Sequence, residues 1–140
     1  YINKLFPIIE DIDRKSYGTF FYCLSLFTLI SIYWDKNPLA LIAGCFVMTF
    51  GDGLAGLIGK IYKSKSWVVF NQKKSLIGTM TMFFTSFLIM SLIGYFDKNN
   101  FTLSYLYLAS LATLLEQISI VGIDNLTVPI ISSVAFDIFV

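Results

Sequence analysis

The residue best suited to chemistry is an acid at the end of an apolar run. Asp52 lies between Gly51 and Gly53, and residues 41–50 before it carry no charge. An unpaired carboxylate is costly to bury in a membrane-length segment, so acids found there usually bind a cation or take part in a reaction. The simpler alternative is a structural ion pair between Asp52 and a loop lysine. In either case, the rest of the chain must bring partners to Asp52.

Composition excludes several other chemistries. The chain has no histidine, which rules out imidazole bases and Ser-His-Asp triads. Cys23 and Cys45 lie in apolar segments without metal-ligand spacing, so neither a disulfide nor a zinc site is expected. The formal net charge of +1 provides no overall attraction to nucleic acid.

The elements that must position Asp52 are predicted to be membrane helices. The 140 residues are 56% hydrophobic and 14% charged, whereas soluble domains carry about 25% charged residues. No alternating ten-residue pattern recurs, so helices are expected rather than strands. The sequence therefore predicts a single all-α domain over residues 1–140, a polytopic membrane helix bundle with about five transmembrane helices. These apolar segments cover residues 17–34, 38–58, 76–96, 101–118 and 126–140.

Basic residues predict how the bundle is oriented. With five crossings, the breaks at residues 1–16, 59–75 and 119–125 fall on one side of the membrane. These breaks carry eight of the ten Lys and Arg residues, and the opposite side carries only Lys36 and Lys98. Since basic loops favour the cytoplasm, the first set of breaks is predicted to be cytoplasmic.

This topology gathers acids and lysines at one membrane face. Asp52, Glu116 and Asp124 all lie near the cytoplasmic ends of predicted helices, beside the lysine-rich loop at residues 59–75. Acids and lysines together are what the binding of a phosphate group and its metal ion requires. Lys60, Lys63 and Lys65 are more simply explained as topology determinants or contacts to anionic lipid headgroups.

The glycines near Asp52 match the residue pattern of a nucleotide-binding motif but lack its structural context. Gly51-x-Gly53-x-x-Gly56 matches the dinucleotide fingerprint, but no acid follows about 20 positions later and the preceding run is predicted to be a membrane span. Gly51, Ala55 and Gly59 recur every four residues, which predicts close packing of a neighbouring helix.

Several motifs, taken in order along the chain, resemble the phytol, farnesol and dolichol kinases. They are Ser16-Tyr17-Gly18-Thr19, Met48-Thr49-Phe50-Gly51-Asp52-Gly53-Leu54-Ala55, Lys73-Lys74-Ser75, Gly78-Thr79, Met82-Phe83, Glu116 and Gly122-Ile123-Asp124-Asn125-Leu126-Thr127-Val128-Pro129. Among the branches of this family, the chain is most similar to the phytol kinases of cyanobacteria and plastids. Relatives carry further membrane segments before this region, so the chain is expected to be a fragment or a processed form.

The resemblance implies a reaction and its participants. The family transfers the γ-phosphoryl group of a nucleoside triphosphate, typically CTP, to the hydroxyl of a long prenyl alcohol with a divalent metal such as Mg²⁺. It also implies an integral protein of a bacterial or cyanobacterial inner membrane, a thylakoid membrane or a plastid membrane. The active face is predicted to be cytoplasmic from the distribution of basic residues. An alcohol with its tail in the bilayer presents its hydroxyl at the interface, where the acids and lysines are predicted to gather.

Site roles follow from this reaction. Asp52 and Asp124 are assigned to Mg²⁺, because hard carboxylate oxygens suit that ion. Lys74 is assigned to the β or γ phosphate, with Lys73 as its more exposed neighbour. Glu116 is assigned as the general base that accepts the alcohol proton.

Four further residues are candidate contacts of the phosphate, metal or nucleotide, and three of them have a second interpretation. Ser75 and Gly78 form a phosphate-facing turn, or they cap the third segment. Asn125 and Thr127 contact the metal or the nucleotide, or Asn125 caps the fifth segment.

Two alternative functions remain open. A lipid-phosphate cytidylyltransferase would use similar residues and release pyrophosphate, whereas a kinase releases CDP. A transporter, or a membrane protein that binds an ion or lipid, would show binding without consumption of nucleotide.

Overall fold

The computed structural model describes residues 17–70, 72–98, 102–119 and 122–140. The basic residues Lys4, Arg14 and Lys15, and Ser16 of the first motif, lie outside the described residues. The helices are α2 (Gly18–Tyr33), α3 (Pro38–Phe46), η3 (Val47–Asp52), α4 (Gly53–Ile61), α5 (Leu76–Lys98), α6 (Ser104–Gln117) and α7 (Asp124–Phe139). The strands are β1 (Ser66–Val69) and β2 (Gln72–Ser75).

The helices coincide with the predicted apolar segments, and the chain is mostly helical as expected. α3, η3 and α4 run on without a break, so that Pro38–Ile61 is one membrane-length helix, and Leu76–Asp97 is the other. Both are apolar enough to cross a membrane, whereas α2 is apolar but has only 16 residues. Among the described residues, two helices of this kind suggest association with a membrane, and the five transmembrane spans stay a prediction.

The predicted loop at residues 59–75 contains an antiparallel hairpin at residues 66–75, which was not predicted from the sequence. Its register pairs Ser66 with Ser75 and Trp67 with Lys74, and Phe70 in the connecting turn has a φ of 44°. Aromatic and β-branched residues in β1 favour extended backbone. Each strand has only four residues, too few to give the alternating pattern by which strands are recognised in a sequence.

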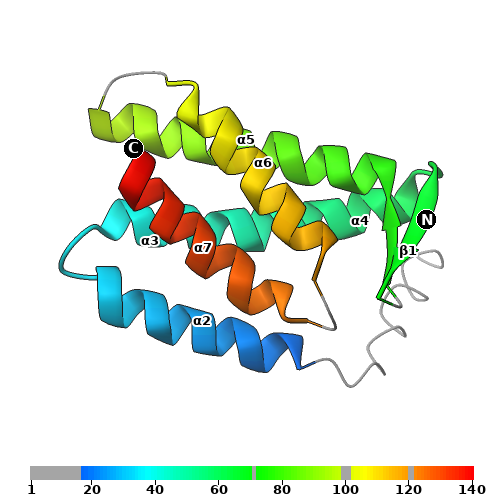
Figure 1. The fold of residues 1–140 in the computed structure, drawn as a ribbon, viewed down its shortest axis with the longest axis horizontal. Helices are drawn as coiled ribbons and strands as arrows, with labels where there is room; N and C mark the ends of the chain where they lie inside the picture. Colours follow the sequence, from blue (N-terminus) through cyan, green and yellow to red (C-terminus); the bar gives the residue numbers. More distant parts are fainter. Residues whose placement is uncertain (1–16, 71, 99–101, 120–121) are drawn as a thin grey trace, which may run out of the picture.

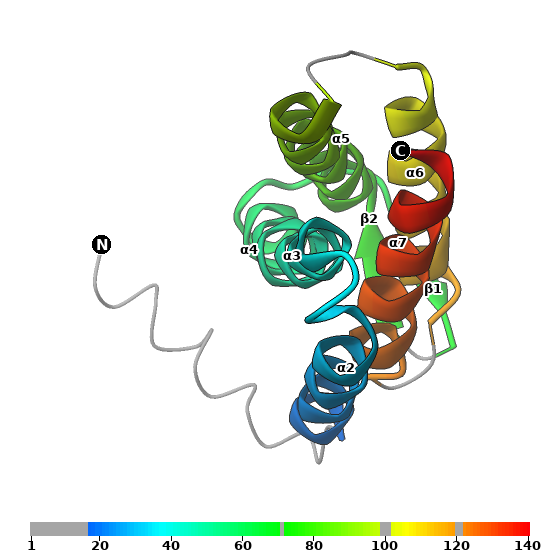
Figure 2. The same ribbon diagram turned by 90° about the vertical axis from the view of Figure 1, so that its left-hand side faces the viewer.

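The helices pack in two layers (Figure 2). α5 and the continuous α3–η3–α4 helix form one layer, and α6 and α7 form the other, with α2 packed against α7. The hairpin lies at one end of the bundle, beside α4 and the start of α5 (Figure 1). The core consists of apolar side chains from every layer, including Leu29, Val47, Met82, Met90, Tyr105, Leu108, Val128 and Phe136.

Small residues set the spacing between α4 and α5, as the repeat of Gly51, Ala55 and Gly59 predicts. A Cβ atom added at Gly51 would lie 2.8 Å from Met82 Sδ, and one added at Gly59 would lie 2.6 Å from Ser75 Oγ. From the facing helix, a Cβ added at Gly78 would lie 3.0 Å from the Ala55 carbonyl oxygen. The two helices can approach this closely only because these positions are small.

Two backbone features place the ends of the helices near Asp52. η3 is a π-helical segment that ends at Asp52, and such segments inside α-helices are frequent at functional sites. Gly122, with a φ of +84°, precedes α7, and a Cβ atom there would lie 3.0 Å from the backbone of Gly18. Glycine accommodates both this conformation and this contact, which brings the start of α7 beside the start of α2.

Candidate active site

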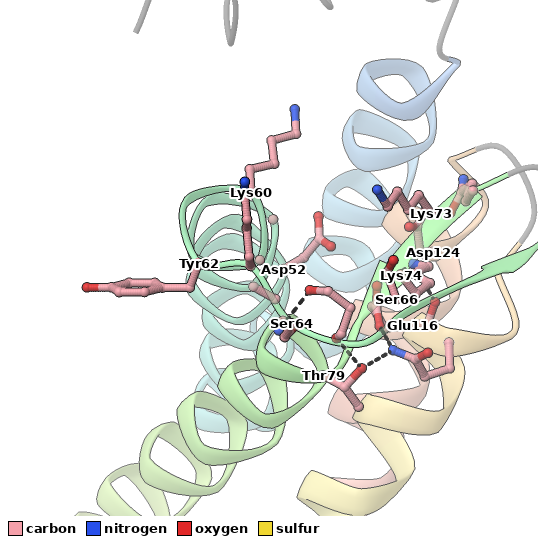
Figure 3. Close-up of a pocket in the computed structure, with 18 residues that line it drawn as sticks. Asp52, Lys60, Tyr62, Ser64, Ser66, Lys73, Lys74, Thr79, Glu116 and Asp124 are labelled. Carbon is pink, nitrogen blue, oxygen red and sulfur yellow. Dashed lines mark hydrogen bonds and ion pairs between the residues drawn. The ribbon is translucent and has the colours of Figure 1, made fainter. Parts of the chain in front are cut away.

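A cavity of about 770 Å³ lies at the hairpin end of the bundle (Figure 3). Its walls come from α4, the α4–β1 connection, β2, the start of α5, the end of α6 and the start of α7. The lining is largely polar, and it consists of Asp52, Ala55, Gly56, Gly59, Lys60, Tyr62, Lys63, Ser64, Ser66, Gln72, Lys73, Lys74, Ser75, Gly78, Thr79, Glu116, Gln117 and Asp124.

Three acids from three different elements meet at this cavity. Asp52 ends η3, Glu116 lies in the last turn of α6, and Asp124 begins α7. Glu116 and Asp124 are buried, with exposed fractions of 6% and 8%. The predicted gathering of these acids with Lys73 and Lys74 is therefore found in the structure, although their side of the membrane stays a prediction.

Glu116 is the acid that pairs with a lysine. Lys74 Nζ forms an ion pair with Glu116 Oε1 and also donates a hydrogen bond of 2.9 Å to the Glu116 carbonyl oxygen. Gln117 Nε2 donates to Glu116 Oε2 at 2.7 Å and to Thr79 Oγ1 at 2.8 Å. Both carboxylate oxygens of Glu116 are thus engaged, and this network holds Lys74 in the cavity wall.

Sequence reasoning did not single out Gln117 or Thr79 as site residues. Thr79 belongs to the Gly78-Thr79 motif of the family resemblance, and the signal for Gln117 was its position next to Glu116, a predicted site residue. The hydrogen bond between them joins residues 38 positions apart, a distance over which no local pattern operates.

Asp52 has a different environment. Within the described ranges, no residue donates a hydrogen bond to its carboxylate and no lysine forms an ion pair with it. The structure therefore does not support the alternative that Asp52 is a structural ion pair. In Figure 3 the Asp52 carboxylate and the Lys73 side chain extend into the same space, whereas Tyr62 points away from it.

The carboxylate oxygens at the cavity suit a metal ion whose other ligands are phosphate oxygens of a substrate. Asp52 and Asp124 line the same cavity, but in the described part of the chain no three His, Cys, Asp or Glu side chains are grouped closely enough to hold a metal ion. Mg²⁺ is usually held by one or two carboxylates, with phosphate oxygens and waters as its other ligands. Two aspartates at a cavity wall fit that pattern.

The predicted residues of the hairpin and of α5 also reach the cavity. Lys73 is exposed on β2 opposite Val68, and Ser75 and Gly78 line the cavity. Ser75 Oγ accepts a hydrogen bond of 3.1 Å from the Gly78 backbone N–H. This is the capping contact that was one of the two interpretations of Ser75 and Gly78.

The two predicted residues of α7 differ in position. Asn125 does not cap the helix, because Ile123 occupies the N-cap position. Asn125 instead lines a smaller cavity beside Asp52. Thr127 lines neither cavity, and its hydroxyl donates to the Ile123 carbonyl oxygen at 3.2 Å. The structure therefore does not bring Thr127 to the site.

The smaller cavity is a shallow, open hollow with a volume of about 210 Å³. It is lined by Tyr22, Met48, Thr49, Asp52, Gly53 and Asn125. The Tyr22 and Thr49 hydroxyls are hydrogen bonded at 2.8 Å, which links α2 to η3. Asp52 belongs to both cavities and so lies at their boundary.

Among the described residues, two helices are long and apolar enough to cross a membrane, and a cavity lined mainly by polar side chains lies at one end of them. Comparison with known proteins gives the family. The chain is 37% identical over 135 residues to the phytol kinase of Synechocystis sp., a match that covers 93% of the chain and 58% of the relative. It is 31% identical to probable phytol kinase 1 of Oryza sativa, covering 84% of the chain and 40% of that protein.

A third relative is named for a different alcohol, farnesol. The chain is 27% identical to the farnesol kinase of Arabidopsis thaliana, over 88% of the chain and 43% of the relative. These similarities confirm the predicted resemblance to the phytol and farnesol kinase family, while the dolichol kinase branch stays a prediction. The chain spans only about half the length of these relatives. No family model matches the chain, and no solved structure matches it significantly.

Proposed function

We propose that this chain forms the catalytic part of a kinase that transfers the γ-phosphoryl group of CTP to the hydroxyl of an isoprenoid alcohol, with phytol as the first candidate. The observation that carries the proposal is the convergence of Asp52, Asp124 and the Lys74–Glu116 pair on one cavity. The relatives that are named phytol kinase and farnesol kinase supply the substrate class.

The larger cavity is proposed to bind the nucleotide. Its volume of about 770 Å³ lies within the range of about 300–1,000 Å³ typical of ligand pockets. Lys74 would neutralise the β or γ phosphate, and Lys73 would act as an exposed second cation. Nothing in the lining distinguishes CTP from ATP or UTP, so the choice of CTP rests on the resemblance.

Asp52 and Asp124 are the residues proposed to hold Mg²⁺. When bound, the ion would neutralise charge on the phosphate oxygens, which is the main requirement of phosphoryl transfer. The Asp52 carboxylate suits this role because no hydrogen-bond donor among the described residues engages it.

Glu116 is proposed to position Lys74. Its two carboxylate oxygens accept hydrogen bonds from Lys74 and Gln117. Neither oxygen is therefore free to accept the proton of the alcohol. The general-base role of Glu116 stays a prediction, and the hydrogen bonds to both oxygens argue against it. In the loose transition state usual for phosphoryl transfer, positioning and charge neutralisation contribute more than proton removal.

The bilayer is the proposed source of the alcohol. Pro38–Ile61 ends at the larger cavity, so an alcohol whose tail lies beside the apolar helices would present its hydroxyl near Asp52. We propose a cyanobacterial, bacterial inner or plastid membrane, with the cavity on the cytoplasmic or equivalent side. The oligomeric state is not part of the proposal.

The test is transfer of label from γ-labelled CTP to phytol, farnesol and dolichol by the full-length protein in membranes. ATP and UTP serve as competing donors, and Asp52→Asn is the matched variant. Labelled prenyl phosphate that depends on Asp52, with release of CDP, would support the proposal. Release of pyrophosphate would indicate a cytidylyltransferase. No turnover by a well-inserted protein would refute the kinase assignment and favour a binding or transport role.

A further inference from the structure

We propose that the smaller cavity between α2, η3 and α7 binds the hydroxyl end of the acceptor alcohol, and that Tyr22, Thr49 and Gly53 determine how well it is bound. This inference rests on the proposed kinase function. It adds a second subsite to the site already described and assigns it to the acceptor rather than to the nucleotide.

The first argument is the position of the cavity. In phosphoryl transfer the attacking and leaving oxygens lie roughly in line on opposite sides of the phosphorus. The acceptor must therefore reach the γ-phosphate from the side opposite the nucleoside diphosphate. A cavity that meets the larger one at Asp52 offers such an approach, because Asp52 lines both.

The second argument is the character of the two linings. The larger cavity includes four lysines, namely Lys60, Lys63, Lys73 and Lys74, together with hydroxyl and amide side chains. No lysine among the described residues lines the smaller cavity, and its walls are Met48, the glycine Gly53 and the uncharged side chains of Tyr22, Thr49 and Asn125, besides Asp52. Charge favours a triphosphate in the first, whereas an alcohol on an apolar chain suits the second.

The third argument is the access from the apolar side of the bundle. Tyr22 belongs to α2, an apolar helix, and Met48 and Thr49 lie within the membrane-length helix Pro38–Ile61. Phe46 and Phe50 on that helix are 45% and 48% exposed. A prenyl tail can lie along such an apolar surface while its hydroxyl enters the cavity.

The hydroxyl groups of the lining can bind an alcohol. Thr49 Oγ1 lies 2.8 Å from Tyr22 Oη and also donates to the Cys45 carbonyl oxygen at 2.8 Å. With the Thr49 proton directed to Cys45, the Tyr22 hydroxyl donates to Thr49, and the lone pairs of Tyr22 Oη remain open to an alcohol O–H. Asn125 adds an amide to the same cavity.

The transfer step balances with the substrates named. The alcohol oxygen forms a bond to the γ-phosphorus while the bond from that phosphorus to the β,γ-bridging oxygen breaks. The nucleoside diphosphate leaves with the electron pair of that bond, and the hydroxyl proton passes to water in the larger cavity. The products are a prenyl monophosphate, CDP and one proton.

Glycine substitutions provide a steric test. A Cβ atom added at Gly53 or at Gly56 would have no heavy atom within 4 Å, so neither substitution creates a clash at that position. Gly53 lines the smaller cavity and Gly56 lines the larger one. Gly53→Leu and Gly56→Leu are therefore a matched pair on one helix, each directed at one subsite.

The experiment measures KM for phytol and KM for CTP separately, using the full-length protein in membranes. We expect Gly53→Leu to raise KM for phytol by about tenfold or more with KM for CTP unchanged. Gly56→Leu is expected to do the reverse. Tyr22→Phe, which removes only a hydroxyl, is expected to raise KM for phytol by about 3- to 10-fold.

The results separate this inference from the proposed function. Wild-type protein that transfers phosphate to no alcohol would refute the kinase assignment. An active wild type whose KM for phytol is unchanged in both Gly53→Leu and Tyr22→Phe would overturn the acceptor subsite alone. A rise in KM for CTP in Gly53→Leu would also overturn it, because the smaller cavity would then belong to the nucleotide.

Discussion

The ion pair between Lys74 and Glu116 makes a quantitative prediction about Lys74→Met. This substitution removes the ammonium and keeps most of the apolar stem, so it isolates the effect of the charge. The two side chains are only 10% and 8% exposed, and removal of Lys74 leaves the Glu116 carboxylate buried without its cation. Breaking a buried pair in this way usually costs about 3–5 kcal/mol.

The expected loss lies at the lower end of that range. Gln117 still donates a hydrogen bond to Glu116 Oε2, and the cavity admits some solvent. A loss of about 3 kcal/mol is a large part of the 5–15 kcal/mol that stabilises a typical protein. The double variant Lys74→Met with Glu116→Gln removes the orphaned charge, and we expect it to recover about 2 kcal/mol of this stability.

Two measurements on the same preparations check the prediction. Thermal or denaturant unfolding in detergent gives the stability of the wild type, Lys74→Met and the double variant. Transfer from γ-labelled CTP gives their activity, which should be absent from both variants because the phosphate-binding ammonium is missing. Equal stability of Lys74→Met and the wild type would show that the pair is not buried as described. Recovery of transfer in the double variant would show that Lys74 does not bind phosphate.

Three further predictions follow from individual contacts. Asp52→Asn should lower kcat/KM by more than about a hundredfold without lowering the unfolding midpoint, because no described residue is hydrogen bonded to this carboxylate; a lowered midpoint with normal transfer would contradict its assignment. Glu116→Gln should lower kcat modestly and keep the pH–rate profile, whereas a loss of about 10²–10⁴-fold with disappearance of the acidic limb would establish Glu116 as general base. Gly78→Val should cost about 1–3 kcal/mol because its Cβ would lie 3.0 Å from the Ala55 carbonyl oxygen. Gly56→Ala, measured in the same unfolding assay, is the control because its Cβ meets nothing within 4 Å.

Local patterns were sufficient for the helices and for the small-residue contact between them. The length of each apolar run depends only on neighbouring residues, so residues 17–34 and 76–96 already predicted α2 and α5. The repeat of Gly51, Ala55 and Gly59 predicted the close packing that α4 makes with α5. The hairpin was not predicted, because four-residue strands have too few positions for an alternating pattern to be recognised.

The charged residues of the candidate site were predictable, but the pairing between them was not. A charge in an apolar run singled out Asp52, and helix connectivity brought Glu116 and Asp124 to the same end. Thr127 was predicted at the site from its motif and lies outside it, because the α-helix turns its hydroxyl back to the Ile123 carbonyl.

The sequence by itself determined the helical segments, the acid within an apolar helix and the end of the bundle where charges gather, since these depend on local hydrophobicity and on loop order. Only the tertiary structure decided that Lys74 pairs with Glu116, 42 positions away, and that Asp52 has no such partner among the described residues. It also decided that Asp52 lies between two cavities. Such relations depend on how α4, α6, α7 and the hairpin meet in space, and distances of a few ångströms between distant residues leave no periodic signal in a chain.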